Sequence, residues 1–206
     1  MGKRVIVNTV EKKQLLAGYV LLLVAAFAVV LAFGGSTYIE VLRYQRDAIF
    51  AGQLWRLLTA SFVHLNWSHT LMNIGALIII WGLFGHVLAN RVWVLITLGC
   101  ALGVSAGILL LNPEISSYVG LSGILHGYFT AGAVAERWTH KRTTAVMLLL
   151  VSSKLLWEQI VGPMPGSAET AGGNIIVDAH LYGAITGLVL GWYFSREGDT
   201  KAKRTG

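Results

Sequence analysis

The chain is divided into long apolar runs separated by short polar gaps. Six runs are long enough, or nearly so, to cross a bilayer, because about 20 apolar residues rising about 1.5 Å each span its hydrocarbon core. We place these runs at residues 15–33, 67–88, 92–111, 121–138, 144–161 and 178–194. Pro113, Pro163 and Pro165 fall in the gaps, where a residue that breaks helical hydrogen bonds does least harm. The pattern predicts an all-α membrane protein, built as a bundle of six transmembrane helices.

The composition supports a membrane protein over other classes. Hydrophobic residues make up 55% of the 206 residues and charged residues 13%, with a mean hydropathy of +0.64. These values leave too little polar surface for a soluble domain and too little charge for a disordered chain. The net charge of +6 does not indicate a nucleic-acid partner, because the basic residues cluster at the tails and in one short loop without interleaved aromatic residues. Cys100 is the single cysteine, so no disulfide forms within the chain.

The placement of lysine and arginine predicts the orientation of the spans, since these residues favour cytoplasmic loops. They cluster in residues 1–14, in the loop 137–142 and in residues 195–206, whereas the loops after the third and fifth runs contain none. We therefore expect two cytoplasmic basic tails, 1–14 and 195–206, on either side of one membrane domain, 15–194. The outer loop 34–66 holds three arginines against this rule, and we expect it to be partly folded.

The first run has an alternative interpretation as a cleaved signal peptide, because it follows a basic start. It is about 19 residues long, which exceeds the apolar region of a typical signal peptide, and no clear small-x-small site follows it. We interpret it as an anchor helix.

A few polar side chains lie inside the apolar runs, where each is costly unless it pairs or functions. In the second run His69 and Asn73 are four residues apart and so share a helical face, with His64 just before them. Ser122 lies at the start of the fourth run, and His180 at the start of the sixth. These three runs all begin on the non-cytoplasmic side. The polar side chains at their starts are therefore expected at one depth, close enough to meet.

Helical spacing brings Ser122 and His180 face to face. His180 begins a stripe of small residues, where another backbone can approach closely, and the stripe continues with Gly183, Gly187 and Gly191. The fourth run has a similar stripe beside Ser122, formed by Gly123, Gly127 and Ala131. If the two stripes pack, the serine and the histidine provide the minimum groups for nucleophilic acyl transfer. His69 and Asn73, on a third helix, are suitable donors to the developing oxyanion.

Taken singly, each of these motifs is more often a packing feature than a catalytic one. The alternative functions are a small channel and a protein that binds membrane clients without cutting them. Convergence at one depth from three helices favours catalysis, and the polar residues lie only at one end of the runs, without a continuous path. Asp178 points away from the face of His180, so the pattern predicts a dyad of Ser122 and His180. The histidines lack the spacing typical of zinc ligands, and we expect neither a metal nor another cofactor.

Together these residues resemble the rhomboid family of intramembrane serine proteases, over about residues 15–194. The matching motifs are Trp55-Arg56 in the first loop, His69-x-x-x-Asn73, Gly120-Leu121-Ser122-Gly123, and Ala179-His180 followed by Gly183 and Gly187. The resemblance implies a six-helix bundle in which Ser122 is the nucleophile and His180 the base. It also implies that His69, Asn73 and the Ser122 amide surround the oxyanion, with Gly120 and Gly123 lining the site.

Departures from the common rhomboid pattern resemble the rhombosortase branch. His126 stands four residues after Ser122, where many rhomboids have tyrosine, and Lys154 and Glu158 lie within the fifth run. This branch implies a multi-pass enzyme of the bacterial inner membrane, with a site that opens toward the periplasm. Its partners would be membrane lipid and secreted proteins whose C-terminal sorting tails carry Gly-Gly, an apolar helix and a basic end. Water or an amine would release the acyl-enzyme.

Alternatives stay open for the function and for the roles of His126, Lys154 and Glu158. A generic rhomboid protease would cut other transmembrane segments, and a rhomboid-like protein without activity would only bind them. We expect His126 to pack against His180, the other interpretation being that it competes as the base. Lys154 and Glu158, four residues apart, are expected either to neutralise each other or to receive a substrate carboxylate or an incoming amine.

Overall fold

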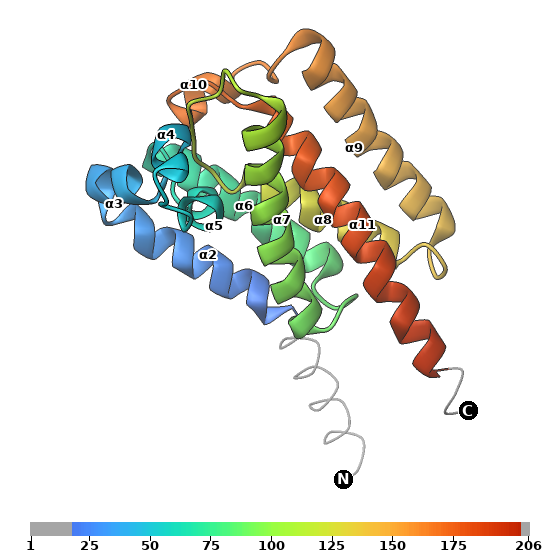
Figure 1. Ribbon diagram of the computed structural model, residues 1–206. Coiled ribbons are helices and arrows are strands. Elements are labelled where there is room, and N and C mark those ends of the chain that lie inside the picture. The colour runs from blue at the N-terminus through green and yellow to red at the C-terminus, as the bar shows by residue number, and fades with distance from the viewer. Residues whose placement is uncertain (1–17, 203–206) are drawn as a thin grey trace.

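The protein is a bundle of helices, seen here in a computed structural model that describes residues 18–202, with side chains up to Ser195 (Figure 1). Each of the six apolar runs overlaps a helix in the described residues, with ends that differ from the predicted ones. The long helices are α2 (Tyr19–Ala32), α6 (Trp67–Phe84), α7 (Asn90–Leu111), α8 (Ser122–Ala135), α9 (Lys141–Val161) and α11 (Val177–Ala202). The short elements are α3 (Gly35–Leu42), β1 (Tyr44–Gln45), α4 (Arg46–Phe50), α5 (Arg56–Thr59), the 3-10 helix η1 (Ala60–Phe62), β2 (Ser117–Tyr118) and α10 (Ser167–Ala171).

Helix α8 lies in the centre of the bundle and packs against α6, α7, α9 and α11. Ten of its 14 residues are buried. The two predicted small-residue stripes do pack: a Cβ added at Gly183 would collide with the carbonyl oxygen of Gly123, and one at Gly187 with that of Gly127. Because α8 and α11 approach with backbone against backbone, their first turns are held at a fixed spacing.

By length and composition, three helices can cross a membrane, namely α6, α7 and α9, among the described residues. Helices α2 and α3 make a fourth candidate if they are taken as one span, although the chain bends by 114° between them. Helix α8 ends at Ala135, short of the predicted 138, and its 14 residues are too few for a span of the usual length. Helix α8 is enclosed by other helices, and this close packing agrees with its many small residues.

The loop 34–66 is folded, as predicted. It contains α3, α4, α5 and η1, and β1 pairs antiparallel with β2, with Tyr44 opposite Tyr118, so the all-α prediction misses one two-residue ladder. Arg56, one of the arginines that break the charge rule, is buried and structural. Its Nη1 donates to the carbonyl oxygens of Glu40 at 2.9 Å and Arg43 at 2.8 Å.

The ends of the chain agree only in part with the predicted boundaries. The predicted tail 1–14 and the start of the first run, 15–17, lie outside the described residues. Helix α11 continues to Ala202, past the predicted end of the last run at 194. The division into one membrane domain and two basic tails stays a prediction.

Candidate active site

Ser122 and His180 are in hydrogen-bonding contact. Ser122 is the first residue of α8, and His180 lies in the first turn of α11. The distance from Ser122 Oγ to His180 Nε2 is 2.9 Å, and the histidine is buried, with 6% of its surface exposed. The spatial prediction made from helical spacing is therefore correct, and the pair has the geometry of a hydroxyl nucleophile with its base.

The turn before Ser122 is fixed by its own hydrogen bonds. Gly120 has φ of +122°, a conformation that glycine adopts readily, and its carbonyl oxygen accepts from Tyr118 Oη at 2.6 Å. The next amide, Leu121 N–H, donates to Nε2 of the buried His64 at 3.3 Å. Burial, and then the nearby His69, lower the pKa of His64 to about 3, so its neutral ring can act as this acceptor. These hydrogen bonds hold Ser122 in a fixed position at the start of α8.

Helix α6 supplies two polar side chains that each have a nitrogen without a partner among the described residues. Asn66 caps this helix by accepting from His69 N–H at 2.7 Å, and it also donates to the carbonyl oxygen of Ala171 at 3.1 Å. His69 and Asn73 are buried, and His69 Nδ1 and Asn73 Nδ2 have no hydrogen-bond partner in the part of the chain that the structure describes. Asn73 Nδ2 is always a donor, whereas His69 Nδ1 donates only in the tautomer that carries its proton. A buried donor without a partner is costly, so both nitrogens are candidates to donate to a ligand atom.

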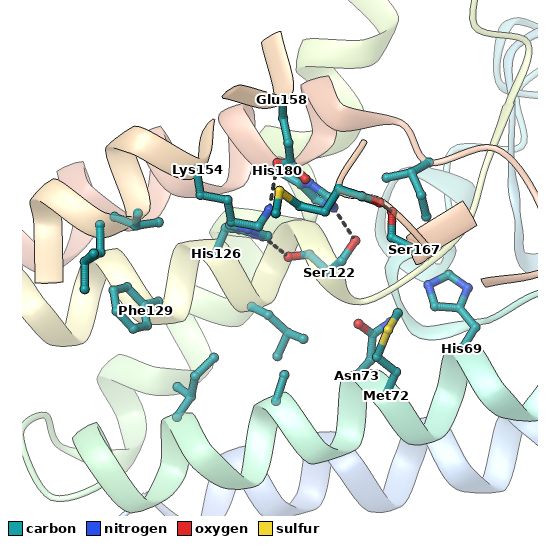
Figure 2. A pocket seen from close by; sticks show the side chains of 17 residues that line it. His69, Met72, Asn73, Ser122, His126, Phe129, Lys154, Glu158, Ser167 and His180 are labelled. Atoms are coloured by element: carbon teal, nitrogen blue, oxygen red, sulfur yellow. Dashed lines mark hydrogen bonds and ion pairs between the residues drawn. The ribbon is translucent and has the colours of Figure 1, made fainter. Parts of the chain in front are cut away.

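Two cavities meet at Ser122 and His69. The first, of about 470 Å³, lies between α6, α8 and α9, and Figure 2 shows the side chains that face into it. Its lining comprises His69, Met72, Asn73, Ala76, Ile80, Ser122, Leu125, His126, Phe129, Leu150, Val151, Lys154, Glu158, Met164, Ser167, Ile175 and His180. The second, of about 390 Å³, is lined by the loops around β2 and before α11. A bound peptide segment that passes from the apolar cavity to the loop-lined cavity would therefore contact the hydroxyl of Ser122.

A carboxylate that the sequence did not assign to the pair contacts His180. Glu158 Oε2 lies 2.9 Å from His180 Nδ1 and 2.7 Å from Lys154 Nζ. The predicted dyad is therefore incomplete as a description of the contacts. Asp178 is excluded as the partner, as predicted, because its Oδ2 accepts from Asn112 Nδ2 at 3.1 Å. The sequence did contain one signal of this contact, namely the charged pair Lys154 and Glu158 within an apolar run. Spacing along one helix could not show that Glu158 meets His180 on another helix.

His126 packs against His180, as we expected. The two rings are stacked, with centroids 4.3 Å apart and planes inclined by 22°. His126 Nδ1 lies 2.7 Å from the carbonyl oxygen of Ser122 and must donate to it, because a carbonyl only accepts. His126 therefore contacts the backbone of Ser122 and the ring of His180, without a hydrogen bond to Ser122 Oγ.

Three of these side chains have the composition of a metal site. Ligand atoms of His126, Glu158 and His180 lie within 4.8 Å of one another, a grouping that sequence spacing did not predict. Glu158 Oε2 is already paired with the ammonium of Lys154, which a metal cation would have to displace. The donor set fits the serine and histidine chemistry better than a metal centre.

We expect Gly120→Ala to displace His69 and to slow the reaction of Ser122 with a fluorophosphonate. An added Cβ would lie 3.0 Å from His69 Cε1, and the backbone strain alone costs about 1–3 kcal/mol. Gly52→Ala is the matched control, because Gly52 also has a positive φ, +96°, but nothing lies within 4 Å of its added Cβ. Both variants should lower Tm, and only Gly120→Ala should slow the labelling of Ser122, by about tenfold or more if His69 is misplaced. Equal labelling rates in the two variants would contradict this.

Comparisons with known proteins agree with the geometry. The rhomboid domain family matches residues 51–197. A curated relative, the chloroplastic rhomboid-like protein 11 of Arabidopsis thaliana, is 27% identical over 151 residues, which cover 69% of this chain and 53% of the relative. The chain thus spans about half the length of the relative that it matches. Since the family match covers most of the chain, including Ser122, His180 and Glu158, the protein belongs to the rhomboid family.

Proposed function

We propose that the protein is an intramembrane serine protease in which Ser122 is the nucleophile and His180 the general base. The observation that carries this proposal is the 2.9 Å contact between Ser122 Oγ and His180 Nε2 at the junction of two cavities. Membership of the rhomboid family supports the same activity.

The first half of the reaction forms an acyl-enzyme. The Ser122 proton moves to His180 Nε2 as Oγ attacks the scissile carbonyl, whose electron pair moves onto its oxygen. The amide of Asn73, the ring of His69 where its free nitrogen is protonated, and the amide of Ser122 at the helix start are suited to bind that oxyanion. His180 then gives its proton to the leaving amine as the C–N bond breaks. In the second half, His180 takes a proton from water or another amine as this group attacks the ester carbonyl. The C–O bond to Ser122 then breaks, and His180 returns the proton to Ser122 Oγ.

The proposed membrane arrangement has six crossings, by α2, α6, α7, α8, α9 and α11. Both termini lie in the cytoplasm of a bacterium, and the site opens to the periplasmic side of the inner membrane. The support is that Ser122, His180 and Glu158 lie at one end of the bundle, next to the loops after α7 and α9. Neither of these loops contains lysine or arginine.

The substrate that we propose is a C-terminal sorting tail with Gly-Gly, an apolar helix and a basic end, as in the rhombosortase branch. The cavity between α6 and α9 is lined mainly by apolar side chains and suits the apolar helix of such a tail. A glycine pair at the end of that helix unwinds easily, and unwinding exposes a carbonyl that a regular helix holds hydrogen-bonded.

A reporter with such a tail, reconstituted with the protein in vesicles, should be cut beside Gly-Gly. Replacing the pair by Leu-Leu should lower kcat/KM by about 10- to 30-fold, because each leucine stabilises the helix that must unwind by about 0.8–1 kcal/mol. The mass of the product shows whether water or an amine releases it. Equal cutting of both reporters would favour a generic rhomboid protease; no cutting of either, with Ser122 unreactive, would favour a protein that only binds clients.

A further inference from the structure

We propose that Glu158 is a positioning residue that completes a Ser122–His180–Glu158 triad, and that Lys154 holds the Glu158 carboxylate in place. This inference rests on the proposed function. In this proposal the Lys154–Glu158 pair of α9 orients the base His180 and does not bind the substrate.

The contacts fix the protonation pattern of His180. A carboxylate only accepts hydrogen bonds, so the 2.9 Å contact between Glu158 Oε2 and His180 Nδ1 requires a proton on Nδ1. In the neutral ring the lone pair then lies on Nε2, which faces Ser122 Oγ at 2.9 Å. This is the tautomer that can accept the serine proton, and the carboxylate selects it.

The charges around His180 are balanced. The Glu158 side chain is 2% exposed, and an unpaired carboxylate at that depth would be costly. Lys154, one turn earlier on α9 and 35% exposed, supplies the balancing charge at 2.7 Å. When His180 takes up the serine proton, its new positive charge forms beside the Glu158 carboxylate. The transition state gains an attraction that the neutral ground state lacks.

Three contacts together leave His180 little freedom (Figure 2). Glu158 holds Nδ1, Ser122 occupies Nε2, and the ring of His126 covers one face at a centroid distance of 4.3 Å. Through the reaction the transferred proton stays on Nε2 until it passes to the leaving amine, and Glu158 gains no proton. A purely structural role for Glu158, as a bridge between α9 and α11, would stabilise the bundle but would not set the tautomer.

Glu158→Gln tests this proposal, because glutamine has the shape of glutamate but can donate an amide hydrogen bond to His180 Nδ1. That hydrogen bond favours the tautomer with its proton on Nε2, which cannot accept the serine proton. We expect kcat to fall by about 10³- to 10⁴-fold with KM changed by less than about twofold. Glu158→Asp, which restores the carboxylate on a shorter stem, should recover part of the lost kcat. The matched control is Glu169→Gln, an exposed glutamate of α10, which should behave as the wild type.

The tautomer can be measured directly by ¹⁵N NMR of labelled histidine in detergent, with the His180 signals assigned by their loss in His180→Asn. We expect the proton on Nδ1 in the wild type and on Nε2 in Glu158→Gln. If Glu158→Gln cuts the reporter as the wild type does, or keeps the Nδ1 proton, the triad is wrong. Those results leave the proposed function intact, whereas a wild type that neither cuts nor reacts with a fluorophosphonate overturns that function independently of the tautomer.

A loss of folding in Glu158→Gln is separated from a loss of chemistry by the aspartate variant. If Glu158→Asp and Glu158→Gln have equal Tm but only the aspartate variant cuts, the carboxylate acts on His180 as proposed. If the two variants lose Tm and kcat in parallel, Glu158 is a structural bridge and the inference is overturned.

Discussion

Ser122→Ala should lower kcat by about 10⁶-fold, to the background rate, and should abolish labelling by a fluorophosphonate. The reason is that Ser122 Oγ is the atom in contact with His180 Nε2, and no other group at the cavity junction can replace it as a nucleophile of that geometry. His180→Ala should cost about as much, because the two groups act as one unit. The double variant should be no slower than either single one.

The measurement is cleavage of the reporter in vesicles, together with gel detection of the fluorophosphonate adduct. Ser153→Ala is the control, since Ser153 is an exposed serine of α9 outside the cavity lining. It should cut and label as the wild type does. Residual cutting or labelling in Ser122→Ala would show that another residue is the nucleophile, and the proposed mechanism would be wrong.

The Ser122–His180 contact could be predicted because helical periodicity carries enough information. Spacings of three and four residues place His180 on a glycine stripe, and the stripe near Ser122 has the same small residues. Two such stripes can pack at only a few registers, and the structure shows backbone against backbone at Gly183 and Gly123. The depth of Ser122 and His180 follows from the common side on which their helices begin.

The role of Glu158 could not be predicted in this way, because it depends on how α9 is rotated against α11. The sequence shows that Lys154 and Glu158 share a face, and the structure confirms the pair at 2.7 Å. Nothing in the spacing along α9 says which helix that face meets. The bend of 114° between α2 and α3 falls directly after the predicted first run, 15–33, so the end of that run agrees with the structure, whereas the size of the bend could not be read from the sequence.

Asn73→Ala should lower kcat by about 10²- to 10³-fold and leave KM nearly unchanged, the effect of losing one donor to an oxyanion. The Asn73 amide is buried, faces the cavity that contains Ser122, and has an Nδ2 without a partner among the described residues. The scissile oxygen becomes a strong acceptor only when it gains charge. The donor therefore contributes to the transition state more than to substrate binding.

The matched control for Asn73→Ala is Thr70→Val on the same helix. Thr70 is buried and donates to the carbonyl oxygen of Asn66 one turn earlier, but its side chain does not line the cavity. Thr70→Val tests whether disturbing α6 is enough to slow cleavage, and it should leave kcat within about threefold, as expected for a residue that does not touch the reacting atoms. Binding of a peptide aldehyde, which forms a tetrahedral adduct with a reactive serine, should weaken in Asn73→Ala and not in Thr70→Val. A rise in KM at constant kcat in Asn73→Ala would instead assign Asn73 to ground-state substrate binding, and the oxyanion would then depend on His69 and the Ser122 amide.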